Sequence, residues 1–152
     1  MNAIIRKADR NEADFKKIGD LLVRFAGEFA MGSLGAESFD PLRSAAWAAR
    51  NLECGVWIAE VDGVPVGTIG VHETTPWYSN TPYLTDGWLY VLPEHRNFSV
   101  ASGLIGAAKQ FAVEKGLPLV LNIFNMENTE TKIKLFQRKG FKLVGGTFIS
   151  GE

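Results

Sequence analysis

The segment 93–102 has the residue types and the spacing to hold a phosphorylated ligand. It reads Pro-Glu-His-Arg-Asn-Phe-Ser-Val-Ala-Ser and joins an apolar, strand-like run to a helical pattern. A loop of this kind directs several backbone N–H groups to one place at the positive end of a helix, where phosphate oxygens bind. The guanidinium of Arg96 would add a charge-assisted hydrogen bond. The loop alone leaves a second interpretation open, because many ordinary helices also begin after a charged loop.

The composition excludes several other kinds of chemistry. Cys54 is the only cysteine, so we expect neither an intramolecular disulfide nor a cysteine-built zinc site. His72 and His95 are the only histidines, which argues against a histidine metal cluster, and we predict no metal. The net charge of −1 argues against a nucleic acid or an anionic membrane as partner. A lone thiol and the absence of a secretory pattern favour the cytoplasm.

The elements that must position the loop follow from hydrophobic periodicity. Asn11 and Asp40 are expected to cap two helices, and Asp62-Gly63 is a strong signal for a tight hairpin turn. Gly116 stands where a helix is expected to end. The spacing predicts strands at 3–8, 56–61, 64–73, 86–92, 118–124 and 141–149, and helices at 12–29, 41–52, 99–115 and 129–139.

This order predicts an α/β fold in a single domain, residues 1–152. The first half reads as an antiparallel meander. The second half contains a strand-helix-strand unit, whose crossover should be right-handed and its strands parallel. We therefore expect a mixed sheet with helices on both faces.

Over nearly its full length, the chain resembles the GNAT superfamily of acyl-CoA-dependent N-acetyltransferases. Three segments carry the resemblance: a hairpin, a strand-loop-helix and a closing helix-turn-strand. They read AEVDGVPVGTIGV (59–71), LYVLPEHRNFSVASGLIGAAKQFAVEKG (89–116) and LFQRKGFKLVGG (135–146). The resemblance implies a mostly antiparallel sheet in which the fourth and fifth strands are parallel and splay apart.

The resemblance also implies acetyl-CoA as cofactor, bound in the gap between those two strands. The pantetheine would pair with the edge of the fourth strand at Leu89, Tyr90 and Val91. Asn128 and Phe136, on the last helix, would complete the cofactor site. The pyrophosphate would lie on the loop formed by Arg96, Asn97, Phe98, Ser99, Val100, Ala101 and Ser102.

The sequence departs from the family pattern in three places. Ser99 replaces a glycine that lets backbone approach phosphate closely, although serine offers a hydroxyl donor. Phe136 stands where the family often has a tyrosine that acts as general acid, and phenylalanine cannot donate a proton. The asparagine that usually begins the last helix is off register by one residue, whether Asn128 or Thr129 is compared.

The chemistry implied is the attack of an amine on the thioester, for which a nearby base is useful. Glu73, at the end of the third strand, and Asp86, at the start of the fourth, are the candidate bases, or else simple solvated carboxylates. Tyr90 is the candidate acid, or else a core residue. His72 alternates with Glu73 along the strand, so the two should face opposite sides of the sheet. Asn122 and Asn125, at the splayed end of the fifth strand, could bind pantetheine or local backbone.

The predicted function is transfer of an acetyl group from acetyl-CoA to a primary amine of a small molecule or a protein. The alternatives are a catalytically inactive module that binds CoA or a partner, and transfer of a longer acyl group. The loops 31–40 and 74–85, with the aromatic residues Trp77, Tyr78 and Tyr83, would select the acceptor. A homodimer is left open, since family members are often dimers.

The charge distribution agrees with this assignment. Residues 31–90 hold two basic and seven acidic side chains, whereas residues 91–152 hold eight basic and five acidic ones. Residues 91–152 would suit an anionic cofactor, and the acidic middle segment, residues 31–90, would suit a cationic amine.

Overall fold

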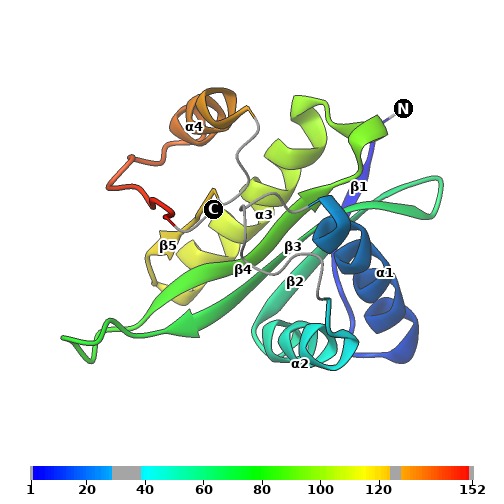
Figure 1. Cartoon of the computed structure of the whole chain (residues 1–152), viewed down its shortest axis with the longest axis horizontal. Coiled ribbons are helices and arrows are strands. Elements are labelled where there is room, and N and C mark those ends of the chain that lie inside the picture. The colour runs from blue at the N-terminus through cyan, green and yellow to red at the C-terminus, as the bar shows by residue number, and fades with distance from the viewer. Residues whose placement is uncertain (1, 29–38, 124–127, 151–152) are drawn as a thin grey trace.

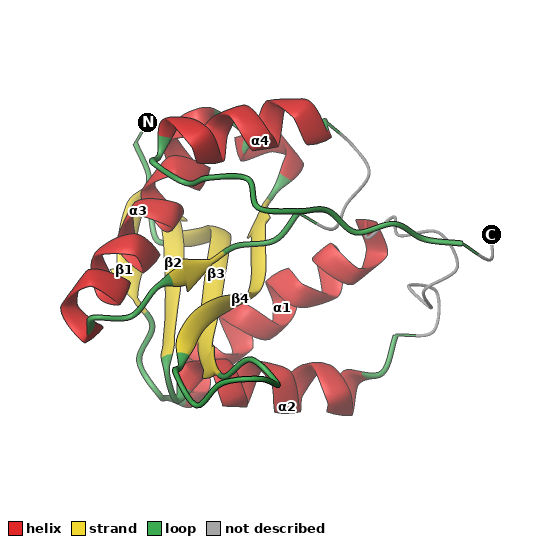
Figure 2. Ribbon diagram, turned by 90° about the vertical axis from the view of Figure 1, so that its left-hand side faces the viewer, coloured by secondary structure: helices red, strands yellow, loops and turns green. Residues whose placement is uncertain are grey.

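The protein forms one five-stranded sheet with helices on both faces (Figures 1 and 2). The computed structural model describes residues 2–28, 39–123 and 128–150. The sheet order is β1-β2-β3-β4-β5, and every neighbouring pair is antiparallel except β4 and β5. The strands are β1 (Ile4–Lys7), β2 (Gly55–Val61), β3 (Val64–Thr74), β4 (Tyr83–Val91) and β5 (Leu119–Val120). The predicted α/β class and mixed sheet are confirmed.

Two helices, α1 (Glu12–Glu28) and α2 (Pro41–Leu52), cover one face of the sheet, and α3 (Phe98–Lys115) covers the other. The short 3-10 turn η1 (Pro93–His95) leads from β4 to α3, and α4 (Thr129–Arg138) follows β5. Apolar side chains from both faces of the sheet form the core, with Ile58, Ile69 and Leu84 fully buried. Burial on both faces explains why β2 and β3 read as nearly continuous apolar runs.

Local signals fix the boundaries of these elements. Asp62 and Gly63 have φ of 51° and 78°, the left-handed backbone that a two-residue hairpin turn requires. Asp40 caps α2 by accepting hydrogen bonds from the N–H groups of Leu42 and Arg43, and Pro41 takes the first helical position. Gly116 ends α3 with φ of 68°.

Three predicted boundaries are wrong. The loop predicted at 74–85 is shorter, because β3 continues to Thr74 and β4 begins at Tyr83. The strand predicted at 118–124 is reduced to two residues. The strand predicted at 141–149 does not form: this segment has no regular structure, and Phe148 is 97% exposed. Gly145-Gly146 interrupts its alternation, and the short β5 offers little edge on which another strand could pair.

Candidate active site

The parallel strands β4 and β5 separate after two residue pairs. The pairs are Leu84 with Leu119 and Thr85 with Val120, and in the part of the chain that the structure describes no ladder pair joins the strands beyond them. The rest of β4, which includes the predicted pantetheine edge at 89–91, therefore runs on without β5 beside it. An unpaired strand edge offers backbone N–H and C=O groups to a ligand with peptide-like amides.

The side chain of Asp86 stands where the strands part. Its Oδ1 accepts a hydrogen bond from the backbone N–H of Asn122 (3.1 Å) and another from the Asn122 side-chain amide (2.9 Å). The Asn122 side chain also donates to the hydroxyl of Thr85. A carboxylate thus takes a backbone donor that follows β5, just after the last ladder pair. Burial raises the pKa of Asp86, and the Asn122 bonds oppose the rise.

A β-bulge follows Asp86 directly. Gly70 of β3 pairs with Trp88 and Val71 pairs with Asp86, so Gly87 is the extra residue. The Gly87 carbonyl accepts a hydrogen bond from the Trp47 indole (3.1 Å). A Cβ on Gly87 would lie 2.5 Å from the side-chain oxygen of Asn51. Only glycine leaves room for α2 at this point.

The bulge decides which side chains of β4 face α1 and α2. Asp86 pairs with Val71 and faces away from α2, because the neighbouring His72 is buried against that helix. After the bulge, Trp88 packs with Ala48 of α2 and Tyr90 stacks on Phe25 of α1 at 5.1 Å. The structure therefore does not bring the candidate base Asp86 and the candidate acid Tyr90 to the same side of β4.

The other candidate base, Glu73, is exposed near the end of β3. His72 faces the opposite side, as predicted: it is buried, and its Nδ1 lies 3.1 Å from Asn51 Oδ1. The Asn51 amide N–H₂ donates to the Trp47 carbonyl, so its oxygen accepts from His72. Burial, with Arg50 nearby, lowers the pKa of His72 and favours the neutral ring.

The predicted phosphate loop forms the start of α3. Asn97 is the N-cap, and its side-chain oxygen accepts from the N–H groups of Ser99 and Val100 and from the Ser99 hydroxyl. Val100 is buried, whereas Ser99 is exposed and Ala101 and Ser102 are half-buried. Phe98 is the first helical residue. The N–H groups predicted to meet pyrophosphate are thus at the predicted place, and two of them already have a side-chain partner.

Arg96 lies just before this N-cap and is linked to β4 and α1. Its Nε donates to the carbonyl of Val91 (2.8 Å), and its guanidinium lies over the Tyr90 ring at 5.6 Å. Its NH2 group forms an ion pair with Glu28, the last residue of α1, at 2.5 Å. The second oxygen of Glu28 accepts from the Tyr90 hydroxyl (2.8 Å).

Within this cluster of Glu28, Tyr90 and Arg96, the pKa values of Glu28 and Tyr90 are shifted. Burial and the Glu28 carboxylate raise the pKa of Tyr90 to about 12. The pKa of Glu28 is lowered, because the bonds from Arg96 and Tyr90 outweigh the effect of burial. Sequence reasoning missed Glu28, which reads as one more polar position of an amphipathic helix. An acidic residue in the last turn was the available signal, since the helix dipole disfavours it there.

The remaining predicted residues belong to α4 and the loops. Asn128 is the N-cap of α4 with φ of 55° and no side-chain capping bond, and Phe136 contacts Phe141, with ring centroids 5.9 Å apart. Lys109 of α3 donates to the carbonyl of Lys139 beside α4. Asn125 and most of the predicted acceptor loop 31–40 lie outside the described residues.

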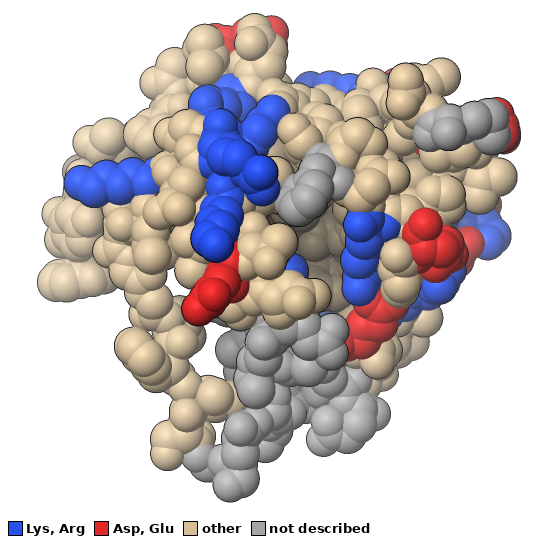
Figure 3. All heavy atoms as spheres, turned by 90° about the horizontal axis from the view of Figure 1, so that it is seen from above, with Lys and Arg blue, Asp and Glu red and all other residues tan. Residues whose placement is uncertain are grey.

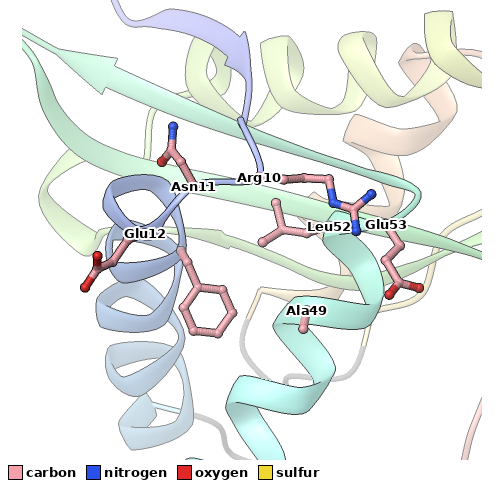
Figure 4. Close-up of a pocket in the computed structure, with 7 residues that line it drawn as sticks. Arg10, Asn11, Glu12, Ala49, Leu52 and Glu53 are labelled. Carbon is pink, nitrogen blue, oxygen red and sulfur yellow. The ribbon is translucent and has the colours of Figure 1, made fainter.

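Two surface hollows lie away from these residues. One is bounded by the start of α1 and the end of α2, with Arg10, Glu12, Phe15, Leu52 and Glu53 among its lining (Figure 4). The other lies at the β3–β4 turn, where Trp77 and Tyr78 pack edge to face and are largely exposed. Neither contains a predicted cofactor or catalytic residue. The predicted site residues instead gather where β4 and β5 part and at the loop before α3.

Seen from above, the end of the molecule near α4 and the start of α3 has Lys and Arg side chains in separate groups with a hollow between them (Figure 3). Within residues 2–28, 39–123 and 128–150, no group of three or more His, Cys, Asp or Glu side chains could hold a metal ion. In the same ranges, no helix has the length and apolar character needed to cross a membrane.

Comparison with known proteins agrees with this geometry. The model of the acetyltransferase (GNAT) family matches residues 16–141. The chain therefore belongs to the GNAT family of acetyltransferases, for which acetyl-CoA is the cofactor. No curated protein matches the sequence.

Solved structures share the fold at low sequence identity. AAC(6')-Iy, in complex with the bisubstrate analog CoA-S-monomethyl-acetylneamine, is 20% identical with a TM-score of 0.71, covering 100% of this chain and 99% of that one. A GCN5-related N-acetyltransferase from Ralstonia eutropha JMP134 is 18% identical with a TM-score of 0.73, covering 97% of both chains. A ribosomal-protein-alanine N-acetyltransferase from Brucella melitensis biovar Abortus 2308 is 20% identical with a TM-score of 0.65, covering 98% and 99%.

Proposed function

We propose that the protein transfers the acetyl group of acetyl-CoA to a primary amine by direct attack on the thioester. The observation that carries the proposal is the early parting of β4 and β5, with the half-buried carboxylate of Asp86 where the strands part and the capped start of α3 at the far end of β4. The pantetheine would pair along the free edge of β4. The pyrophosphate would lie at the N-terminus of α3 beside Arg96.

Asp86 is the residue we assign as base. In the attack, the amine nitrogen forms a bond to the acetyl carbonyl carbon, the carbon–sulfur bond breaks, and CoA leaves as thiolate. The proton lost by the amine goes to Asp86, directly or through a water molecule. Burial raises the pKa of Asp86, which improves it as a base. Glu73 is exposed, which leaves it less suited to the same task.

The leaving thiolate needs no dedicated acid in this scheme. A thiol has a pKa near 8.5, so a thiolate is a tolerable leaving group near neutral pH. Tyr90 is a poor donor because its hydroxyl already donates to Glu28 and its pKa is raised to about 12. Phe136 offers no proton. We therefore assign Tyr90 a structural part beside the cofactor.

The acceptor is an amine of a small molecule or of a protein. One structural neighbour is named for an aminoglycoside analogue and another for the alanine of a ribosomal protein, so both classes enter the proposal. The cytoplasm suits a chain with one free cysteine, since thiols stay reduced there.

The first test is cofactor binding followed by turnover. A ligand at one hundred times its Kd stabilises the native state by about 2.7 kcal/mol, so acetyl-CoA should raise the Tm by about 5–10 °C. Release of free thiol is then measured over a panel that includes neamine and a peptide beginning with alanine. An unchanged Tm at millimolar acetyl-CoA contradicts the proposal.

A second candidate is a CoA-binding module without catalysis. It is favoured by two residues: Phe136 stands where the family often has a tyrosine general acid, and Ser99 replaces a glycine at the start of α3. This candidate predicts a shift in Tm with CoA but no thiol release with any amine. Thiol release above background with one acceptor rules it out.

A further inference from the structure

Glu28 bridges the two parts of the site that a cofactor would join. One carboxylate oxygen pairs with Arg96 and the other accepts from the Tyr90 hydroxyl. The Glu28 and Arg96 side chains are 34% and 43% exposed, so solvent and solutes reach the ion pair. Tyr90, in contrast, is 3% exposed and is held against Phe25. Glu28 therefore has one partner that a solute could displace, Arg96, and one that packing holds in place, Tyr90.

The position of Glu28 is unfavourable for its own helix. It is the last residue of α1, where the helix dipole disfavours a negative charge, and no basic residue stands in that turn. A residue that breaks a local rule without stabilising its own element is expected at a functional site. Arg24, four residues earlier on α1, pairs with Glu94 at 3.9 Å and also acts electrostatically on Glu28, whereas the hydrogen-bond partners of Glu28 are Arg96 and Tyr90.

Phosphate competes directly for Arg96. CoA carries several phosphate groups, and a guanidinium binds phosphate and carboxylate in the same planar geometry. Arg96 immediately precedes the cap of α3, where the proposed function places the pyrophosphate. When phosphate takes the guanidinium, one oxygen of Glu28 is left charged and without its counter-ion, while Tyr90 still holds the other.

We infer that Glu28 changes partner during the reaction cycle: it is the counter-ion of Arg96 in the free protein and, once cofactor is bound, the contact for a charged ammonium group of the acceptor other than the attacking amine. The inference rests on the proposed function and adds to it a specificity residue for cationic acceptors. Tyr90 acts as a positioning residue, because its hydroxyl holds one oxygen of Glu28 on the α1 side of β4.

The test is a pair of binding and kinetic measurements on Glu28→Gln. Removing the internal competitor should tighten CoA binding about two- to fivefold, the range of an exposed ion pair. The KM for the acceptor should rise about tenfold, because a charge-assisted hydrogen bond is lost. The acceptor is whichever amine of the panel the wild type acetylates, and CoA affinity is measured by calorimetry. The two effects have opposite signs, which a general loss of structure would not produce.

Asp20→Asn is the matched control, since it removes one negative charge from α1 in an exposed ion pair with Lys16 rather than with Arg96. It should change neither quantity more than twofold. Tyr90→Phe keeps the ion pair but frees Glu28, so acceptor KM should rise with CoA affinity unchanged.

The outcomes separate the inference from the proposed function. If the wild type binds no CoA, the proposed function fails. If the wild type binds and acetylates but Glu28→Gln leaves both quantities unchanged, or weakens both, the inference is overturned and the function stands. If the wild type binds CoA but acetylates no amine, the proposed function fails, and with it the inferred contact between Glu28 and the acceptor. The CoA affinity of Glu28→Gln then still tests whether Glu28 is the counter-ion of Arg96.

Discussion

Gly87→Ala should destabilise the protein strongly, although it adds a single methyl group. The new Cβ would lie 2.5 Å, 2.6 Å and 2.7 Å from the Oδ1, Nδ2 and Cγ atoms of Asn51. Asn51 is fully buried and cannot swing into solvent. Its two hydrogen bonds, to the Trp47 carbonyl and from His72, hold it in place.

Two costs add at this site. Overpacking a tight site costs about 1–3 kcal/mol. A buried polar group left without its partner costs a further ~1–3 kcal/mol. We expect a total of about 2–6 kcal/mol, which for a chain of this size lowers the Tm by about 4–24 °C. Thermal unfolding followed by circular dichroism measures the change.

A double-mutant cycle tests the steric reason. Asn51→Ala alone leaves His72 unpaired, but in the Gly87→Ala background it removes the clash. The double variant should therefore be more stable than the sum of the single effects by more than about 1 kcal/mol. Gly19→Ala is the control, because a Cβ there meets nothing within 4 Å and should stabilise α1 by about 0.5–1 kcal/mol. A Tm for Gly87→Ala within about 2 °C of the wild type, or an additive cycle, would refute the reasoning.

Three further predictions concern cofactor binding, catalysis and acid stability. Arg96→Ala should weaken acetyl-CoA binding about tenfold or more, since it deletes a charge-assisted bond, and unchanged affinity in calorimetry would contradict its role. Asp86→Asn should abolish the acidic limb of the pH–rate profile: the raised pKa of Asp86 makes the wild-type rate fall as pH drops through it, and Glu73→Gln should leave that limb in place. Asp14 is 4% exposed, and its hydrogen bonds with Arg6 lower its pKa from 3.8 to about 2. The stability that Asp14 contributes is therefore present above its unfolded pKa, and about 2 kcal/mol is lost as pH falls from about 5 to 2. Asp14→Asn should flatten this loss in acid unfolding curves, whereas Asp20→Asn, in an exposed pair with Lys16, should not.

The parts of the fold that periodicity controls were predictable. The amphipathic spacing of α1, the Asp62-Gly63 turn and the caps at Asp40 and Gly116 are local signals, and the structure has them where the sequence predicts them. The final strand was predicted from the same kind of signal and does not form. Alternation of apolar and polar residues predicts a strand only where another strand lies beside it to pair with. A single sequence does not show whether such a partner strand is available.

The candidate site was predictable only in part. The loop before α3 has a linear motif, so its residues could be named in advance. The bond between Asp86 and Asn122 joins residues 36 positions apart, and the pair of Glu28 and Arg96 spans 68. Gly87 within the strand pattern was a weak signal of a bulge that the sequence reading did not use, yet the bulge decides that Tyr90 faces α1 rather than α3. Such contacts depend on register and packing, which one sequence does not encode in any short segment.

Only two residue pairs join β4 to β5, so β5 should open at a lower free-energy cost than the antiparallel strands. Backbone amides of β2 and β3, in the middle of the sheet, should exchange hydrogen for deuterium only when the whole chain unfolds. The amides of β5 depend on two residue pairs and should exchange through a much smaller opening that leaves the antiparallel strands intact. A ligand that lies along β4 and touches both sides of the fork would join the two units into one cooperative block. Cofactor would then slow the amide hydrogen exchange of β5 strongly, even if the atoms of this strand hardly move.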